Sequence, residues 1–332
     1  MQDLTARVVA QYRGKYRVRS EAKEFWAEVT GKMMFSAAAR TDYPIVGDLV
    51  VISELETGHA VIREILSRRT ILCRRAAGKA AVQPIAANLD AAFVVQAVDR
   101  DFNLNRLERY LTLVSAGQIE PVIVLNKSDL ISEEELADKV AQIKERFKNI
   151  EIITTSTVGG AGIEKLRQSI QTGKLYCFVG SSGVGKSSLI NELLGKELIK
   201  TRMISAATKK GRHATTHREL FVLGNGGMVI DNPGIREVGL AQAGEAVADV
   251  FGDVSELAGR CKFADCTHVH EAGCAVLTAV RSGELSEAKY LNYLKLKKEA
   301  DHYGMSSLEK KRKDQSFGRM VKNFKKQMKR SG

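Results

Sequence analysis

A glycine-rich loop in the middle of the chain carries the clearest chemistry. Residues 180–187 read Gly-Ser-Ser-Gly-Val-Gly-Lys-Ser and directly follow the apolar run 175–179. Glycines let successive backbone N–H groups face one concavity, and a helix that begins near Lys186 adds the positive end of its dipole. This pattern predicts a cradle for the phosphates of a nucleotide, in which Lys186 neutralises the β- and γ-phosphates and Ser187 binds Mg²⁺.

A second motif, Asn126-Lys127-Ser128-Asp129, follows another apolar run, 121–125. A carboxylate such as Asp129 can accept two hydrogen bonds from the N1–H and 2-amino groups of guanine, whereas adenine would leave it unpaired. Ligands of open α/β sheets bind at the carboxyl ends of the strands, where this motif lies. We therefore expect Asn126 and Asp129 to select guanine, with Ser156 as a candidate backbone donor to the guanine oxygen.

A third motif supplies further groups to the same phosphates. Residues 231–234 read Asp-Asn-Pro-Gly, and we expect Asp231 to hold Mg²⁺ through water and the Gly234 amide to bind the γ-phosphate. The polar stretch 196–217 has little periodicity, which is typical of functional loops. A threonine there can bind Mg²⁺ when γ-phosphate is present; Thr215 is the first candidate and Thr216 the second.

Three cysteines and two histidines lie within residues 261–274. Cys261, Cys266 and Cys274 with one histidine form a Cys₃His set, which is typical of a closed, structural, tetrahedral Zn²⁺ site. Both His268 and His270 are candidates for the fourth ligand. Metal ligation also fits the cysteine content, because the N-terminus lacks the apolar core of a signal peptide and disulfides are rare without export.

The elements that must position these motifs predict three domains. Four to six short strands in residues 1–70 indicate a small β-barrel, of which the OB-fold is one kind, with Trp26 in its core. Residues 71–240 alternate strands and helices, which predicts a parallel sheet covered on both faces. Residues 241–332 are mainly helical around the Cys/His cluster.

Charge indicates a polyanionic partner. The chain of 332 residues has a net charge of +12, and residues 309–330 contain ten Lys or Arg and two Asp or Glu. Their apolar stripe makes this tail a basic amphipathic helix, for which RNA is the favoured partner and a membrane surface the alternative. No apolar run approaches 18 residues, so we expect no membrane span and a cytoplasmic protein.

The motif order, with the guanine motif before the phosphate loop and residues 231–234 last, resembles the circularly permuted GTPases. Residues 101–111 and 211–213 are similar to the RsgA (YjeQ) family specifically. The resemblance implies a monomeric GTPase that binds the small (30S) ribosomal subunit and its 16S rRNA late in maturation. It implies that hydrolysis of GTP to GDP and phosphate drives release of the protein and of other assembly factors, and it selects His268 as the zinc ligand.

The expected GTP-binding residues are therefore Asn126, Lys127, Ser128, Asp129, Ser156, Gly180, Ser181, Ser182, Gly183, Val184, Gly185, Lys186, Ser187, Ser188, Asp231 and Gly234. Ile235 stands where many GTPases carry a water-orienting glutamine, so intrinsic hydrolysis should be slow. The resemblance suggests His213 for that role, the alternative being an exposed loop histidine, and Ala214 replaces a threonine frequent in the family. Two competing functions are an RNA-binding protein that does not hydrolyse GTP and a GTPase of the translation cycle.

Overall fold

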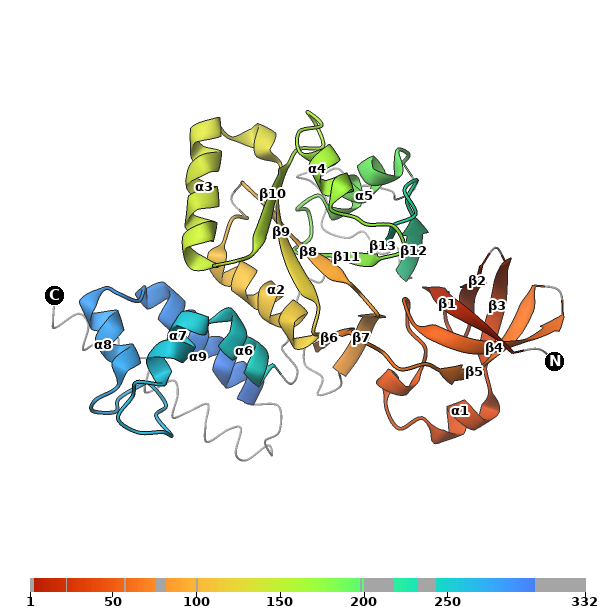
Figure 1. Cartoon of the computed structure of the whole chain (residues 1–332), viewed down its shortest axis with the longest axis horizontal. Helices are drawn as coiled ribbons and strands as arrows, with labels where there is room; N and C mark the ends of the chain where they lie inside the picture. The colour runs from red at the N-terminus through yellow and green to blue at the C-terminus, as the bar shows by residue number, and fades with distance from the viewer. Residues whose placement is uncertain are drawn as a thin grey trace, which may run out of the picture. The chain divides into compact units, whose positions relative to one another are not determined.

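The structure is a computed structural model, which forms two compact units, 1–239 and 240–332 (Figure 1). It describes residues 3–21, 23–56, 58–75, 82–99, 101–197, 199, 218–231 and 243–301. The candidates His213, Thr215, Thr216 and Gly234, and the basic tail, lie outside the described residues. None of the described helices is both long enough and apolar enough to cross a membrane.

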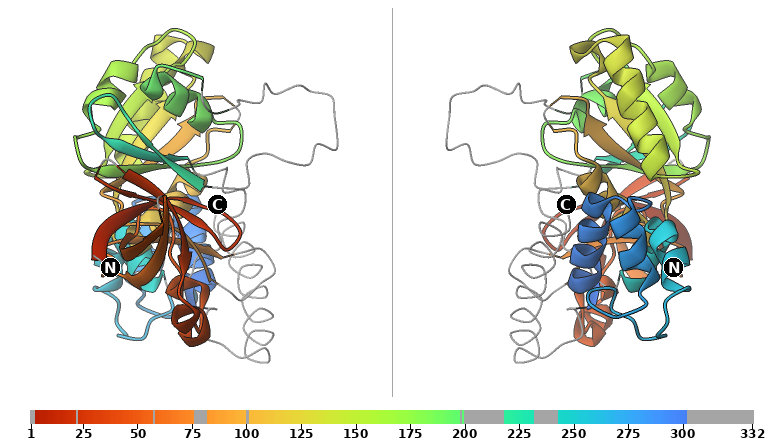
Figure 2. Two further views of the ribbon diagram at one scale, coloured as in Figure 1. Left: turned by 90° about the vertical axis from the view of Figure 1, so that its right-hand side faces the viewer. Right: turned by 90° about the vertical axis from the view of Figure 1, so that its left-hand side faces the viewer.

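A five-stranded barrel opens the first unit, as predicted. Its strands are β1 (Asp3–Gln11), β2 (Tyr16–Ser20), β3 (Lys23–Val29), β4 (Leu49–Glu56) and β5 (His59–Ile65). They follow the order β1-β2-β3-β5-β4, and pairing of β1 with β4 closes the barrel. Viewed from the barrel side, the red and orange strands curve around one centre (Figure 2). Alternate side chains, including Val18, Phe25 and Ile62, fill that centre.

The prediction that Trp26 belongs to the barrel core is wrong. Phe25, Ala27 and Val29 of β3 are buried, whereas Trp26 is 43% exposed. Because successive side chains of a strand point to opposite faces, Trp26 points to the outer face of the barrel. Its ring lies against that of Tyr12, with 5.2 Å between the centroids, so this part of the barrel presents an aromatic pair to solvent.

A sheet of five parallel strands forms the rest of the first unit. These are β8 (Ala91–Ala97), β9 (Glu120–Asn126), β10 (Glu151–Thr155), β11 (Leu175–Val179) and β13 (Met228–Asp231), in the order β10-β9-β8-β11-β13. The helices are α2 (Leu104–Ala116), α3 (Glu133–Arg146), α4 (Ile163–Gln168) and α5 (Lys186–Leu194). Helices α4 and α5 share one buried cluster with the sheet, and α2 packs on β8 and β9 outside that cluster.

The sheet is not purely parallel, because β12 (Arg218–Val222) runs antiparallel to β13. Neither β12 nor the hairpin of β6 (Ile71–Arg75) and β7 (Val82–Ala87) is among the elements that the sequence predicts. Strand β12 also pairs with β1 of the barrel, through Ala10–Glu219 and Gln11–Arg218. Barrel and parallel sheet are therefore hydrogen-bonded into one sheet of 11 strands.

The second unit is helical, as predicted. Its helices are α6 (Gly244–Val250), α7 (Gly252–Ala258), α8 (Ala275–Ser282) and α9 (Glu287–Asp301). Phe251 and Tyr290 are fully buried, and the ring of Tyr293 packs on Phe251. Three short elements of the first unit remain: α1 (Gly31–Ser36) and the 3₁₀ turns Arg40–Asp42 and Ser128–Leu130.

Candidate functional site

The phosphate loop joins the buried strand β11 to α5, as the sequence predicts. Gly180, Gly183 and Gly185 have φ values of 149°, 88° and 98°, a region that side chains with a Cβ rarely adopt. A Cβ on Gly180 would lie 2.3 Å from the Val95 carbonyl oxygen. A Cβ on Gly185 would lie 2.2 Å from Asn126 Nδ2. The glycines are thus required both by the turn and by close neighbours.

Lys186 starts α5 and is buried within the loop. Its Nζ donates to the carbonyl oxygens of Gly180, at 2.9 Å, and of Ser181, at 2.6 Å. Burial lowers the pKa of Lys186 to about 8, against the opposing effect of the Asp231 and Asp101 charges. Ser187 and Ser188 follow in the first turn of the helix, where N–H groups have no helical partner. The arrangement concentrates donors and positive charge where an anion can bind.

The lowered pKa of Lys186 predicts that nucleotide binding takes up a proton. Phosphate oxygens beside Nζ favour the charged amine and so raise its pKa. Uptake should increase from about a quarter of a proton at pH 7.5 to about three quarters at pH 8.5. Calorimetry of GDP binding in buffers of different ionisation enthalpy measures it, and Lys186→Arg, which stays charged, should remove this increase. Equal uptake at the two pH values would contradict the prediction.

The guanine motif lies beside the phosphate loop. Asn126 ends β9 and is fully buried; its Nδ2 donates to the Val184 carbonyl oxygen at 2.8 Å, and its Oδ1 accepts from Thr155 Oγ1 at 3.0 Å. Asn126 therefore ties the phosphate loop to the ends of β9 and β10. Asp129 is exposed on the 3₁₀ turn that begins at Ser128, and it accepts a hydrogen bond from Ser156 Oγ. An exposed, oriented carboxylate can read a base edge.

Asp231 lies at the end of β13 on the other side of the loop. Its Oδ1 is buried and has no hydrogen-bond partner among the described residues. Burial raises the pKa of Asp231, and the Lys186 charge opposes that rise. A buried acceptor without a donor is costly, and a hydrated Mg²⁺ would satisfy it. Asp231 and the Ser187 hydroxyl therefore fit the oxygen ligands or water partners that Mg²⁺ prefers.

The Cys/His cluster of the second unit has the spacing of a metal site. Ligand atoms of Cys261, Cys266, His268 and Cys274 all lie within 4.8 Å of one another. Cys261 Sγ is 3.8 Å from Cys274 Sγ and 3.5 Å from His268 Nδ1, and Cys274 Sγ is 3.7 Å from the same nitrogen. Ligands of a tetrahedral Zn²⁺ lie about 3.8 Å apart for S–S pairs and about 3.5 Å for S–N pairs. The donor set therefore fits this ion.

Local contacts decide which histidine joins the cluster. His268 is 4% exposed, and its backbone carbonyl accepts from the Tyr290 hydroxyl at 2.8 Å. The Glu271 carboxylate accepts from the backbone N–H groups of Thr267, at 2.8 Å, and Val269, at 2.9 Å, which fixes the turn around His268. His270 is exposed and outside the cluster. The structure thus separates two candidates that the sequence leaves open.

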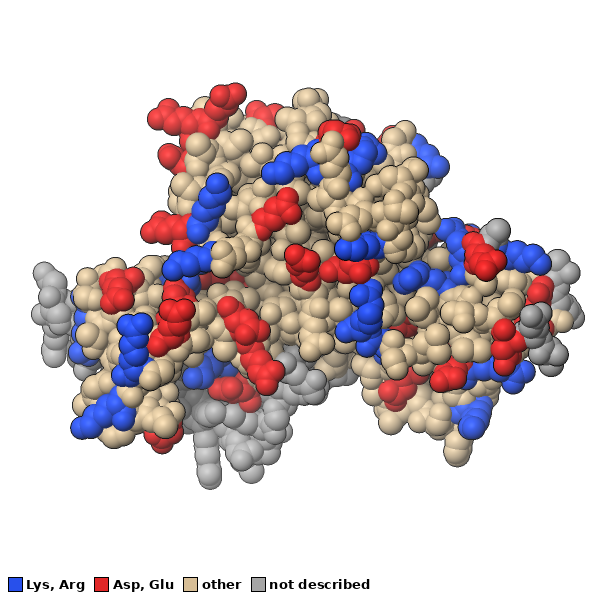
Figure 3. All heavy atoms as spheres, viewed as in Figure 1, with Lys and Arg blue, Asp and Glu red and all other residues tan. Residues whose placement is uncertain are grey.

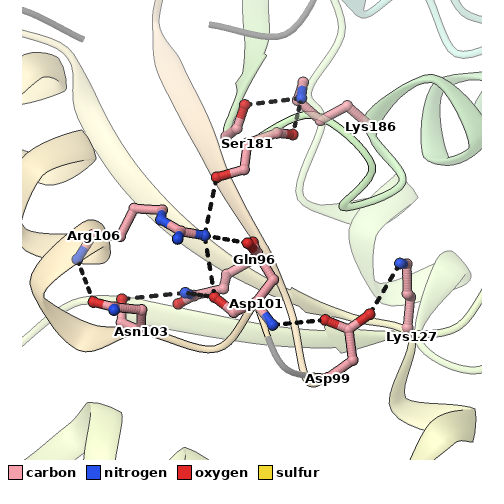
Figure 4. Close-up of polar contacts among 9 residues, drawn as sticks. Gln96, Asp99, Asp101, Asn103, Arg106, Lys127, Ser181 and Lys186 are labelled. Atoms are coloured by element: carbon pink, nitrogen blue, oxygen red, sulfur yellow. Dashed lines mark hydrogen bonds and ion pairs between the residues drawn. The ribbon is translucent and has the colours of Figure 1, made fainter. Parts of the chain in front are cut away.

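A group of polar residues, several of them in the family-like stretch 101–111, lies beside the phosphate loop, and the sequence assigns them no contacts there (Figure 4). Asp99 and Asp101 follow β8, and Arg106 and Tyr110 lie on α2. Arg106 Nη1 donates to Ser181 Oγ at 3.3 Å, and Asp99 Oδ2 pairs with Lys127 Nζ at 3.2 Å. Only the tertiary fold brings these residues to the loop, so no periodicity or spacing could indicate their contacts.

Known proteins with similar sequences carry names that agree with a guanine-nucleotide site. The RsgA GTPase family model matches residues 65–241. The small ribosomal subunit biogenesis GTPase RsgA 1 of Bacteroides thetaiotaomicron is 40% identical over 322 residues, 96% of this chain and 90% of that relative. The small ribosomal subunit biogenesis GTPase RsgA of Opitutus terrae is 42% identical over 307 residues, 89% of this chain and 83% of that relative.

Two solved structures share the fold. YjeQ from Thermotoga maritima matches with a TM-score of 0.66 and 30% identity, covering 92% of this chain and all of that one. YloQ, described as a circularly permuted GTPase, matches with a TM-score of 0.65 and 25% identity over 92% and 97% of the two chains. With the phosphate loop and the permuted motif order, these matches show that the chain belongs to the RsgA GTPase family.

Proposed function

We propose that this protein is a GTPase that binds the small (30S) ribosomal subunit and acts late in its maturation. Hydrolysis of GTP to GDP and phosphate then drives its own release and that of other assembly factors. The observation that carries the GTPase part is the close approach of the guanine motif to the phosphate loop, through the Asn126–Val184 hydrogen bond. The names of the relatives support the ribosomal part.

In the proposed reaction, Asp129 selects guanine, and Asn126 holds the base motif against the phosphate loop. A water molecule attacks the γ-phosphorus in line, and the bond to the β–γ bridging oxygen breaks. Lys186 and the loop N–H groups stabilise the charge that develops on the phosphate oxygens. Ser187, Thr215 and Asp231 would hold Mg²⁺, which neutralises phosphate charge when bound.

Two residues bear on the rate of that reaction. Ile235 cannot orient water, so the basal rate should be slow. We assign the water-orienting role to His213, with Thr215 two residues further along the chain, and we expect this role to depend on the bound ribosomal particle. The proposal thus places part of the active site under the control of the partner.

The flanking domains would bind 16S rRNA. Trp26 is 43% exposed, and it packs on the half-buried Tyr12, next in the chain to the exposed Arg13; bases stack on such rings. On the face shown in Figure 3, acidic and basic side chains are interspersed. Because residues 309–330 contain ten Lys or Arg and two Asp or Glu, we assign the main phosphate contacts to this basic tail. We propose that the three functional domains are 1–70, 71–240 and 241–332, in a cytoplasmic monomer.

The proposal is tested by GTP hydrolysis with and without purified small ribosomal subunits. A slow basal rate should rise by about 10²-fold or more, as when a partner supplies a missing group in other GTPases. Large subunits and free tRNA are the matched controls, and Lys186→Ala should be inactive with every particle. Stimulation by another RNA particle instead would favour a translation-cycle GTPase. Binding of GTP without turnover under any condition would favour the non-enzymatic alternative.

A further inference from the structure

We propose that Arg106 and Tyr110 of α2 are positioning residues for the phosphate loop, and that the segment before α2 connects this loop to the guanine motif. The inference rests on the proposed GTP site and adds a part that none of the nucleotide motifs contains. Its centre is Ser181, the second residue of the loop. The side chain of Ser181 faces α2, and its backbone carbonyl accepts from Lys186 Nζ.

Arg106 and Tyr110 are four residues apart on α2, so their side chains share one face of the helix. Arg106 Nη1 donates to Ser181 Oγ at 3.3 Å. Tyr110 is 4% exposed, and its hydroxyl is hydrogen-bonded to the same serine, which opposes the rise that burial causes in the pKa of Tyr110. Ser181 is therefore held by α2 on one side and by Lys186 on the other.

The guanidinium of Arg106 is itself held in place. It forms an ion pair with the Asp101 carboxylate and donates to the Asp101 carbonyl oxygen at 3.3 Å. Gln96, which is 3% exposed, donates through Nε2 to the carbonyl oxygens of Asp101, at 2.9 Å, and Asn103, at 3.1 Å. Asn103 caps α2 by accepting from the Arg106 N–H at 3.0 Å. A side chain fixed by so many neighbours loses little entropy when it supports the loop.

The same segment reaches the guanine motif. The Asp101 N–H donates to Asp99 Oδ1 at 2.9 Å, and Asp99 Oδ2 pairs with Lys127 Nζ at 3.2 Å. The contacts thus run without a break from the phosphate loop to the guanine motif (Figure 4). Each residue contacts the next in this series: Lys186, Ser181, Arg106, Asp101, Asp99 and Lys127.

A support of this kind should act on binding and not on the chemical step. The phosphate loop holds phosphates that GDP and GTP share, and Arg106 acts on it only through Ser181. Loss of the support should weaken GDP and GTP alike, while turnover of saturated protein stays unchanged, because an interaction that is equal in the ground and transition states changes KM alone.

A double-mutant cycle on the full-length protein tests this. Arg106→Gln and Ser181→Ala should each raise the Kd of fluorescent GDP by about five- to ten-fold, the effect of losing one ordinary intramolecular hydrogen bond. The Kd of the double variant should be no higher than that of the weaker-binding single variant, because Ser181→Ala already removes the contact that Arg106→Gln removes. Arg106→Lys should recover part of the affinity, and the kcat of the Arg106→Gln protein should stay within about twofold.

Arg146→Gln is the matched control. Arg146 Nε pairs with Glu108 Oε1 at 2.7 Å and so anchors the same helix α2 through a different side chain. This variant should lower Tm without changing the Kd of GDP. Additive effects in the cycle, an unchanged Kd in Arg106→Gln, or a fall in kcat at constant KM would each overturn the inference. If the unmodified protein fails to bind guanine nucleotides, the proposed function fails instead.

Discussion

Replacing Asp129 with Asn should weaken GTP binding by on the order of 10²–10⁴-fold and create affinity for xanthosine triphosphate. The carboxylate of Asp129 accepts from N1–H and from the 2-amino group of guanine, and each such charged hydrogen bond contributes about 1.5–3 kcal/mol. An Asn amide still accepts from N1–H, but its NH₂ group meets the guanine amino group, donor against donor. Xanthine carries an oxygen at that position, so the amide can pair with it.

The contact with Ser156 should keep residue 129 in the same orientation after this substitution. Ser156 is 2% exposed, and its Oγ accepts from the N–H groups of Val158 and Gly159, both at 3.2 Å, while it donates to Asp129. The Asn oxygen can accept the same bond, so residue 129 stays oriented. Competition of GTP, ATP and xanthosine triphosphate for fluorescent GDP or its xanthosine analogue measures the switch. Asp129→Ala is the control, since it should lose GTP without gaining xanthosine triphosphate; an equal loss in both variants with no gain would contradict the assignment.

The sequence predicts the positions of the phosphate loop and the guanine motif in the fold where the signal is local. The phosphate loop is a glycine-rich run between a buried strand and a helix; Asn126 ends β9, and Asp129 lies three residues after it. Each motif lies where parallel strands bring it to one edge of the sheet. These predictions depend only on neighbours in the chain and on one general rule about α/β sheets.

Other features are set by contacts that the sequence does not display. Arg106 reaches Ser181 across 75 residues, and β12 finds its partner β1 at the opposite end of the unit's sequence. The sequence analysis places Trp26 in the core, but side chains alternate along β3, so that Phe25 and Ala27 point into the core and Trp26 points out of it. The five residues of β12, Arg218–Val222, also show no clear alternation of apolar and polar side chains.

The Cys/His cluster can be predicted from the sequence only in part. Residue type and spacing predict its three cysteines, but two histidines lie within the same short stretch. The choice depends on backbone geometry: His268 has a φ of 62°, in the left-handed region that reverses the chain. The turn fixed by Glu271 and the hydrogen bond from Tyr290 then direct the His268 ring toward the thiols.

Loss of that cluster should unfold the second unit while the first keeps its nucleotide site. Zn²⁺ in small modules contributes an apparent binding free energy of about 10–16 kcal/mol, which is as large as the whole stability of a typical domain. Cys274 is 2% exposed, caps α8 by accepting from the Leu277 N–H through Sγ, and lies against Cys261. We expect Cys274→Ser to bind little Zn²⁺ and to lose the helical signal of α6–α9.

Metal content, circular dichroism and GDP affinity of the full-length variant measure this outcome. The Kd of GDP should be unchanged, because the phosphate loop and Asp129 lie in the unit 1–239, whereas binding to the small subunit should fall. His270→Ala is the matched control: His270 is exposed and outside the cluster, so its loss should leave metal content and melting unchanged. A Cys274→Ser protein with full Zn²⁺ content and native helicity would contradict the assignment, and loss of metal in His270→Ala would place the fourth ligand there instead.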